Sequence, residues 1–381
     1  MAEAVLPEGV QGSCHSRFAA VADLLGAQLT AGSHHGVAVA VRHRGEPVVD
    51  LWGGAFREDS LVVSFSTTKG PVAIALHQAL ERKGVGYDTP VAAVWPEFAA
   101  HGKGSVTIRQ CLCHEAGVPQ IRDQVDDVWA LTDWDAMVAM TAGLEPLWEP
   151  GTANGYHAIN WGWLAGELVR RIDGRAVDRF LAEEVAGPLG LDGCFLGVPD
   201  DQRHRVVPVA LDPAYGALPR LEDVLPPDSF TVKSLTPRGD LVEFVNSAAG
   251  MAACVPAITG AFTARSLAAI YGDLERGGRP GGTARLLRAE TVAAATSVQN
   301  TRPDLVLLVP MHWRLGFMSG GNFTFSHPGA YGHAGFGGSL AMADPVTELA
   351  VAVTVDLLSP DVLGDGRGRN IVAAAVAAVA G

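Results

Sequence analysis

The chain has little that would direct it to a membrane or out of the cell. Residues 1–18 contain no basic segment followed by an apolar run, so a secretory signal is not expected. The apolar stretches 36–45 and 349–358 are too short to span a bilayer, and the second contains Asp356. The sequence therefore predicts a soluble, cytoplasmic protein without a membrane partner.

An excess of positive charge is also missing. The 381 residues include 28 Lys and Arg against 41 Asp and Glu, which gives a net charge of −13. Such an acidic surface repels phosphate backbones and anionic lipid headgroups, so a nucleic-acid partner is not expected. Hydrophobic residues make up 48% of the chain, which is enough for a large core.

Cysteine is scarce, and neither cysteine nor histidine follows a metal-binding pattern. The five cysteines are Cys14, Cys111, Cys113, Cys194 and Cys254. Their odd number and irregular spacing predict five free thiols in a reducing compartment. The twelve histidines show no H-E-x-x-H spacing, and no G-x-G-x-x-G follows an expected strand. We therefore expect neither a metal nor a cofactor.

Strand patterns occur near both ends of the chain, and helical patterns occupy the middle. A β-hairpin is expected over 37–52, and further strands over 312–318, 331–344 and 349–358. Helices are expected over 16–31, 72–83, 134–143, 158–172, 176–186, 263–276 and 369–380. Between 198 and 255 repeated prolines interrupt the periodicity, which predicts a long irregular surface segment able to cover a site.

This order predicts an α/β fold of the α+β type. A single antiparallel sheet would be built from both chain ends and flanked by the terminal helices. The expected sheet domain comprises residues 1–65 and 286–381, and residues 66–285 form an inserted, mostly helical domain. The active site would lie between the two domains.

Ser66 and Lys69 form an S-x-x-K motif at the start of an amphipathic stretch. Residues three apart share a helix face, so both side chains would point to one place. Apolar residues such as Val72 and Leu76 would bury that face, and burial favours the neutral form of lysine. A neutral amine beside a hydroxyl is a general base beside a nucleophile. The alternative is that Ser66 only caps the helix, because S-x-x-K is common by chance.

Two later residues extend this motif. Tyr156 stands at the exit of a Pro/Gly loop directly before an expected helix, where its phenol could reach a shared site. His333 is followed by several glycines on an expected strand, and glycines in strands often mark the close approach of another backbone or a ligand. The alternatives are an ordinary core or surface tyrosine and a glycine-rich bulge at a sheet edge.

Ser-x-x-Lys, then Tyr before a helix, then His-x-Gly on a late strand is an order that resembles the serine β-lactamase and penicillin-binding-protein superfamily. The chain is most similar to its class C-like branch, which includes carboxylesterases. The stretches 88–98, 106–119, 183–193 and 333–345 are similar as well, so the resemblance spans nearly the whole chain. It implies a β-lactamase/transpeptidase-like fold.

The resemblance also implies a role for each residue. Ser66 would be the acylated nucleophile, Lys69 the base or proton relay beside it, and Tyr156 the second general acid/base. His333 would stand where many lactamases carry the lysine of K-T-G and, with Gly335, would contact the substrate. The oxyanion hole would consist of the backbone N–H groups of Ser66 and Phe336.

Two departures from the lactamase pattern favour esters over β-lactams. The Tyr-x-Asn motif of class C lactamases is replaced by Tyr156-His157-Ala158, and the cationic lysine is replaced by His333. No G-x-S-x-G motif is present, which disfavours an α/β-hydrolase esterase. The sequence thus predicts a serine hydrolase that cleaves small carboxylic esters through an acyl-enzyme. An acyltransferase on the same site, a weak β-lactamase and a catalytically idle binding protein are the alternatives.

Overall fold

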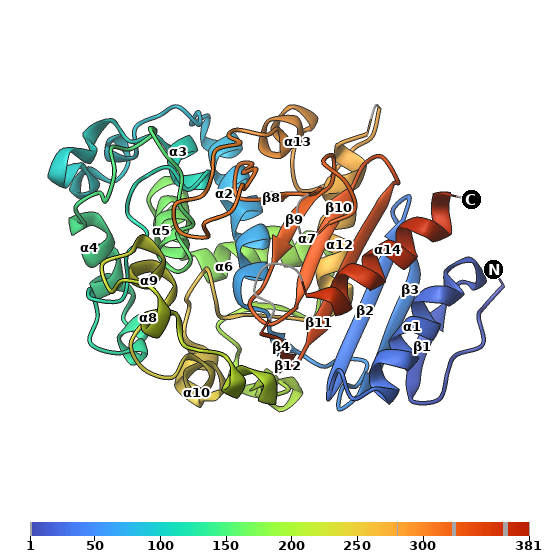
Figure 1. Cartoon of the computed structure of the whole chain (residues 1–381). Coiled ribbons are helices and arrows are strands. Elements are labelled where there is room, and N and C mark those ends of the chain that lie inside the picture. Colours follow the sequence, from blue (N-terminus) through green and yellow to red (C-terminus); the bar gives the residue numbers. More distant parts are fainter. Residues whose placement is uncertain (1, 280, 322–324, 361–364, 381) are drawn as a thin grey trace.

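A seven-stranded antiparallel sheet forms the right-hand part of the molecule in Figure 1. The computed structural model describes residues 2–279, 281–321, 325–360 and 365–380. In sheet order the strands are β1 (Val10–Cys14), β3 (Glu46–Gly54), β2 (Gly36–His43), β11 (Leu349–Val355), β10 (Leu340–Asp344), β9 (Tyr331–Ala334) and β8 (Met318–Ser319). β2 pairs with β11, so that Val37 lies opposite Val355. The prediction of one sheet built from both chain ends is confirmed.

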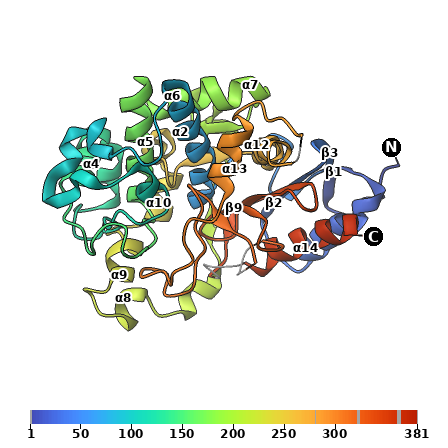
Figure 2. The same ribbon diagram turned by 90° about the horizontal axis from the view of Figure 1, so that it is seen from above.

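Helices cover both faces of this sheet. Helices α1 (Ala19–Thr30) and α14 (Gly366–Ala380) lie together on one face, and α12 (Ala264–Gly277) lies on the other (Figures 1 and 2). All residues of β11 are buried, and a central strand of this kind needs apolar cover on both sides. The sequence placed the 263–276 helix in the inserted domain, but the helix packs on β2, β10 and β11. Helical spacing alone does not show which layer a helix covers.

Most of the remaining helices form the left-hand part of Figure 1 around α2 (Lys69–Lys83), whose residues are all buried from Lys69 to Leu80. Outside the segment 198–255 the other helices are α3 (Ile108–Leu112), α4 (Trp134–Gly143), α5 (Asn160–Asp173), α6 (Val177–Leu181), α7 (Gly187–Leu189) and α13 (Ala289–Thr296). A small antiparallel sheet of β4 (Val62–Val63), β7 (Gly260–Phe262) and β5 (Cys194–Leu196) adjoins the N-terminal end of α2. No helix in the described ranges has the length and apolar character needed to cross a bilayer.

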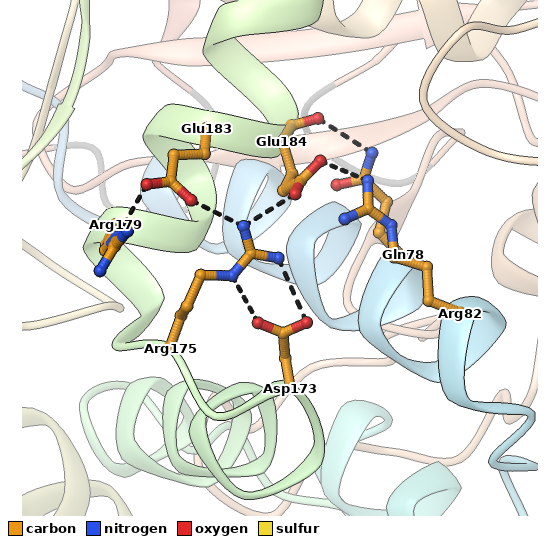
Figure 3. Close-up of polar contacts among 7 residues, drawn as sticks. All are labelled: Gln78, Arg82, Asp173, Arg175, Arg179, Glu183 and Glu184. Atoms are coloured by element: carbon orange, nitrogen blue, oxygen red, sulfur yellow. Dashed lines mark hydrogen bonds and ion pairs between the residues drawn. The ribbon is translucent and has the colours of Figure 1, made fainter.

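A network of ion pairs holds the C-terminal end of α2 (Figure 3). The Arg175 guanidinium donates hydrogen bonds to Asp173 at 2.5 Å, Glu183 at 2.7 Å and Glu184 at 2.8 Å. Glu184 in turn pairs with Arg82 on α2. Arg175 therefore joins the end of α5 to the segment after α6 and, through Glu184, to α2.

Replacing Arg175 with alanine should lower the free energy of unfolding by about 1–3 kcal/mol, more than an exposed pair contributes and less than a fully buried one. Its side chain is 24% exposed and serves three carboxylates at once. Arg179→Ala is the matched control, because Arg179 is 68% exposed and, among the residues that the structure describes, pairs only with Glu183. Urea unfolding of both variants is the measurement, and equal losses would contradict a central role for Arg175.

Two expected strands differ from the structure. Over 312–318 only Met318 is in a strand. All residues from Trp313 to Met318 are buried, so burial does not alternate, and the chain turns where Arg314 N–H donates to the Phe317 carbonyl. The expected strand 331–344 is the hairpin β9–β10. The turn between the two strands occupies residues 335–339. The small residues in this stretch give no sequence signal that separates turn from strand. Strand β1 was not expected at all.

The sequence predicted an irregular segment over 198–255. In the structure this segment contains a series of short helices. Those of the α type are α8 (Leu221–Val224), α9 (Phe230–Leu235), α10 (Leu241–Asn246) and α11 (Ala248–Ala252). Side chains of Ser229, Asp240 and Ser247 cap the N-termini of α9, α10 and α11. Helices of four to six residues are too short to establish a periodicity, which explains the error.

Candidate active site

Ser66 lies in a short 3-10 helix, Phe65–Thr68, which leads directly into α2. The residue before it, Phe65, has a φ of +46°, in the left-handed region that is unfavourable for a non-glycine residue by about 1–2 kcal/mol. Phe65 is buried, and its ring meets that of Phe336 at 5.4 Å between centroids. This packing holds the sharp turn that presents Ser66.

Two glycines allow neighbouring strands to approach this turn. A Cβ atom on Gly335, just after β9, would lie 2.2 Å from the Ser64 carbonyl oxygen. A Cβ atom on Gly260, the first residue of β7, would lie 2.5 Å from Thr68 Oγ1. Only glycine fits at either position, so the glycine after His333 does mark a close backbone approach, as its place in the sequence suggested.

Lys69 is fully buried, and its amine lies beside Ser66. Lys69 Nζ is 3.0 Å from Ser66 Oγ and donates to the Ala158 carbonyl oxygen at 2.7 Å. Burial lowers the pKa of Lys69 well below its usual value, since an apolar environment penalises the ammonium form. The site therefore favours a neutral amine in contact with the Ser66 hydroxyl.

Tyr156 approaches Ser66 from the loop before α5. Its hydroxyl donates to Ser66 Oγ at 2.7 Å, and its ring stacks on Trp313 at a centroid distance of 5.4 Å and an angle of 3°. Lys69 Nζ lies 4.9 Å from the centre of the same ring. Burial raises the pKa of Tyr156, so the phenol stays protonated at neutral pH. The structure thus brings Ser66, Lys69 and Tyr156 together.

Asp304, which the sequence did not single out, positions the tyrosine. Asp304 is buried, and its Oδ1 atom accepts the backbone N–H of Tyr156 at 3.0 Å. Its Oδ2 atom accepts the Trp313 indole N–H at 3.0 Å, while the backbone N–H groups of Val306 and Leu307 also donate to Oδ1. One carboxylate therefore holds both the tyrosine and the ring on which it stacks. A lone aspartate between apolar residues gives no local signal of this role.

Asp304→Asn should lower the free energy of unfolding by about 2–4 kcal/mol, because its amide N–H₂ would face N–H donors and leave buried groups unpaired. Asp133→Asn is the control. Asp133 is an exposed helix cap, and asparagine caps about as well as aspartate. Urea unfolding tests the difference, and a loss under about 1 kcal/mol at Asp304 would show that the network is not central.

His333 lies close to the three residues but is enclosed by protein. It is 1% exposed, its ring centroid is 6.1 Å from that of Tyr156, and its Nδ1 atom bonds the Ala334 carbonyl at 2.8 Å. Burial, with a smaller contribution from Lys69, lowers the pKa of His333 to about 3. It is therefore neutral and supplies no cation. Its neighbours Ala334, Gly335 and Phe336 line the cavity beside Ser66.

His157, which stands inside the altered Tyr-x-Asn motif, fastens the loop of Tyr156. Its Nε2 atom accepts the Val118 N–H at 3.0 Å, and its Nδ1 atom bonds the Gly155 carbonyl at 2.7 Å. These two bonds assign the proton to Nδ1. Burial lowers the pKa of His157 to about 3, so its role is that of a neutral tether.

A cavity of about 580 Å³ leads to Ser66 and Tyr156. Its lining includes residues at the end of β9 and in the adjoining turn, and many residues between 211 and 242. All five cysteines are unpaired, as the sequence predicts. Within the part of the chain that the structure describes, no three His, Cys, Asp or Glu residues are gathered so as to hold a metal.

This combination of fold and site agrees with comparisons to known proteins. The beta-lactamase family model matches residues 21–376. The chain is 33% identical over 378 residues to the esterase/beta-lactamase LipL of Mycobacterium tuberculosis strain ATCC 25618 / H37Rv, covering 94% of this chain and 86% of LipL. The chain belongs to the beta-lactamase family, which confirms the resemblance inferred from its motifs.

Solved structures agree over nearly the full length. A family VIII carboxylesterase is 36% identical, with a TM-score of 0.86 over 97% of this chain and 99% of the other. A penicillin-binding-protein homologue from Caulobacter crescentus is 34% identical, with a TM-score of 0.85 over the same shares. The predicted β-lactamase/transpeptidase-like fold is confirmed.

Proposed function

We propose that this protein is a carboxylesterase that cleaves small-molecule esters through a covalent acyl-enzyme on Ser66. The observation that carries the proposal is the convergence of the Lys69 amine and the Tyr156 hydroxyl on Ser66 Oγ, at 3.0 and 2.7 Å. Relatives named as an esterase and a carboxylesterase support an ester as the substrate.

In the proposed reaction Ser66 Oγ attacks the ester carbonyl carbon, and its proton passes to the neutral Lys69 amine. The tetrahedral intermediate collapses as the C–O bond to the alcohol breaks, and Tyr156 delivers a proton to the leaving oxygen. The proton on Lys69 then restores the phenol. Water attacks the acyl-enzyme along the reverse proton path and releases the carboxylic acid.

The backbone N–H groups of Ser66 and Phe336 would stabilise the oxyanion. In the described part of the chain neither N–H donates to another protein group, whereas the neighbouring Thr67 and Gly335 N–H groups do. Both residues line the cavity, and two free donors beside it suit an oxygen that gains negative charge.

A fluorophosphonate probe followed by mass spectrometry tests the proposal. The intact protein should gain one phosphonyl group, and the peptide carrying the adduct should place it on Ser66. Thr67 and Thr68 are internal controls, because their buried hydroxyls bond other protein groups. Labelling elsewhere, or none at all, would overturn the proposed nucleophile.

Turnover of β-lactams should be weak. Ala158 supplies no side-chain amide and His333 no cation, and a hydrogen bond to a charged group contributes about 1.5–3 kcal/mol. We therefore expect kcat/KM for a cephalosporin to be at least about tenfold below that for p-nitrophenyl acetate. A cephalosporin value equal to or above the ester value would contradict this expectation.

A further inference from the structure

One wall of the cavity beside Ser66 consists largely of apolar side chains that are exposed to solvent. The proposed catalytic residues form little of this wall. Leu211 is 44% exposed and Leu221 is 39% exposed, and both line the cavity together with Leu235, Val242 and Met311. Large exposed apolar side chains that gather in a hollow are typical of a ligand site. Most of this wall comes from the short helices of the segment 198–255.

The polar side chains of the wall are already engaged with the protein. Arg220 pairs with Glu222, and Asp240 accepts the N–H groups that begin α10. Thr236 bonds the Val232 carbonyl oxygen at 2.7 Å.

The remaining polar groups of the wall are satisfied in the same way. Tyr215 donates to the Ser359 carbonyl at 2.7 Å, and Ser319 accepts from Arg314 at 2.9 Å. Arg220, whose side chain is 75% exposed, and the exposed Asp240 remain solvent-accessible charged groups of the wall, whereas its other polar side chains are engaged within the protein.

We infer that the substrate is an ester with a bulky apolar group, which lies against the apolar side chains of the wall formed by residues 211–242. A cavity of about 580 Å³ is of the size that encloses a drug-sized molecule, much larger than an acetyl ester. Burial of each methylene can increase kcat/KM by up to about fourfold. This inference rests on the proposed function of Ser66 and names the substrate class for that site.

The test is a series of p-nitrophenyl esters from acetate to octanoate, assayed below their micelle concentrations. We expect kcat/KM to rise at least about tenfold along the series. The p-nitrophenyl monoester of octanedioic acid has the same length but ends in a carboxylate. It should react at least about tenfold more slowly than the octanoate, since its carboxylate would lose water against the leucine and valine side chains of the wall. A parallel series of acetate esters of longer alcohols tests whether the alcohol group, rather than the acyl group, lies against the wall.

Variants locate the effect in the wall. Val242→Trp and Leu235→Trp, on two different helices, should each lower the octanoate-to-acetate ratio of kcat/KM at least about fivefold, because they fill the cavity. This ratio does not depend on the fraction of folded enzyme. Val224→Trp is the matched control in the same segment, since Val224 is 57% exposed and does not line the cavity.

Flat profiles in both ester series, or equal rates for the octanoate and its charged analogue, would overturn the inference. If Ser66 still reacts with the fluorophosphonate in that case, the proposed esterase function stands. Absence of labelling together with absence of turnover would overturn both.

Discussion

Replacing Ser66 with alanine should abolish hydrolysis of p-nitrophenyl esters, with a loss in kcat of about 10⁴-fold or more, and should remove fluorophosphonate labelling. The alanine side chain leaves Lys69 and Tyr156 in place but removes the Ser66 Oγ atom that both contact. The measurement is steady-state turnover together with intact-protein mass spectrometry.

Ser64→Ala is the control for this experiment. Ser64 lies two residues earlier and is also buried, but its hydroxyl donates to the Val62 carbonyl oxygen rather than to the cavity. We expect this variant to keep labelling and most of its activity. If Ser66→Ala retains wild-type turnover, the acyl-enzyme mechanism is wrong.

Replacing Lys69 with methionine should lower kcat about 10²–10⁴-fold, the usual contribution of a general base. Methionine fills similar space without an amine, so Ser66 keeps its position while its proton loses its acceptor. In the wild-type enzyme activity should fall on the acidic side as Lys69 becomes protonated. Because burial lowers the pKa of Lys69, this loss should occur well below the usual lysine value of about 10.4.

The same variant should be more stable than the wild type at pH 7. Between the lowered pKa of folded Lys69 and about 10.4, the unfolded chain binds one proton more than the folded one, so wild-type stability rises with pH in this window. Lys69→Met lacks this dependence. Urea unfolding at pH 7 and pH 9.5 should show that the difference in the free energy of unfolding between the variant and the wild type is smaller at the higher pH. If the variant is less stable than the wild type, or if the difference in the free energy of unfolding is the same at both pH values, folded Lys69 remains charged.

Local patterns predicted a large part of the fold. The alternation in 37–52 and 349–358 predicted paired strands, and helical spacing predicted α5 and α12 to within a few residues. Both signals concern neighbours in sequence, where side-chain direction follows directly from backbone geometry. Errors arose where small residues hide a turn, as between β9 and β10, or where helices are too short for a period, as in 198–255.

For the candidate site, the sequence by itself determined the pair Ser66 and Lys69, because a spacing of three residues at a helix start leaves their relative position little freedom. Only the tertiary structure decided that Tyr156, ninety residues later, donates to the same oxygen. It also decided that Asp304 holds Tyr156 and that helices between 211 and 242 line the cavity. These contacts join residues that are far apart in the sequence and depend on how the layers of the fold pack together. Side-chain periodicity is a local property and does not specify against which layer a segment packs.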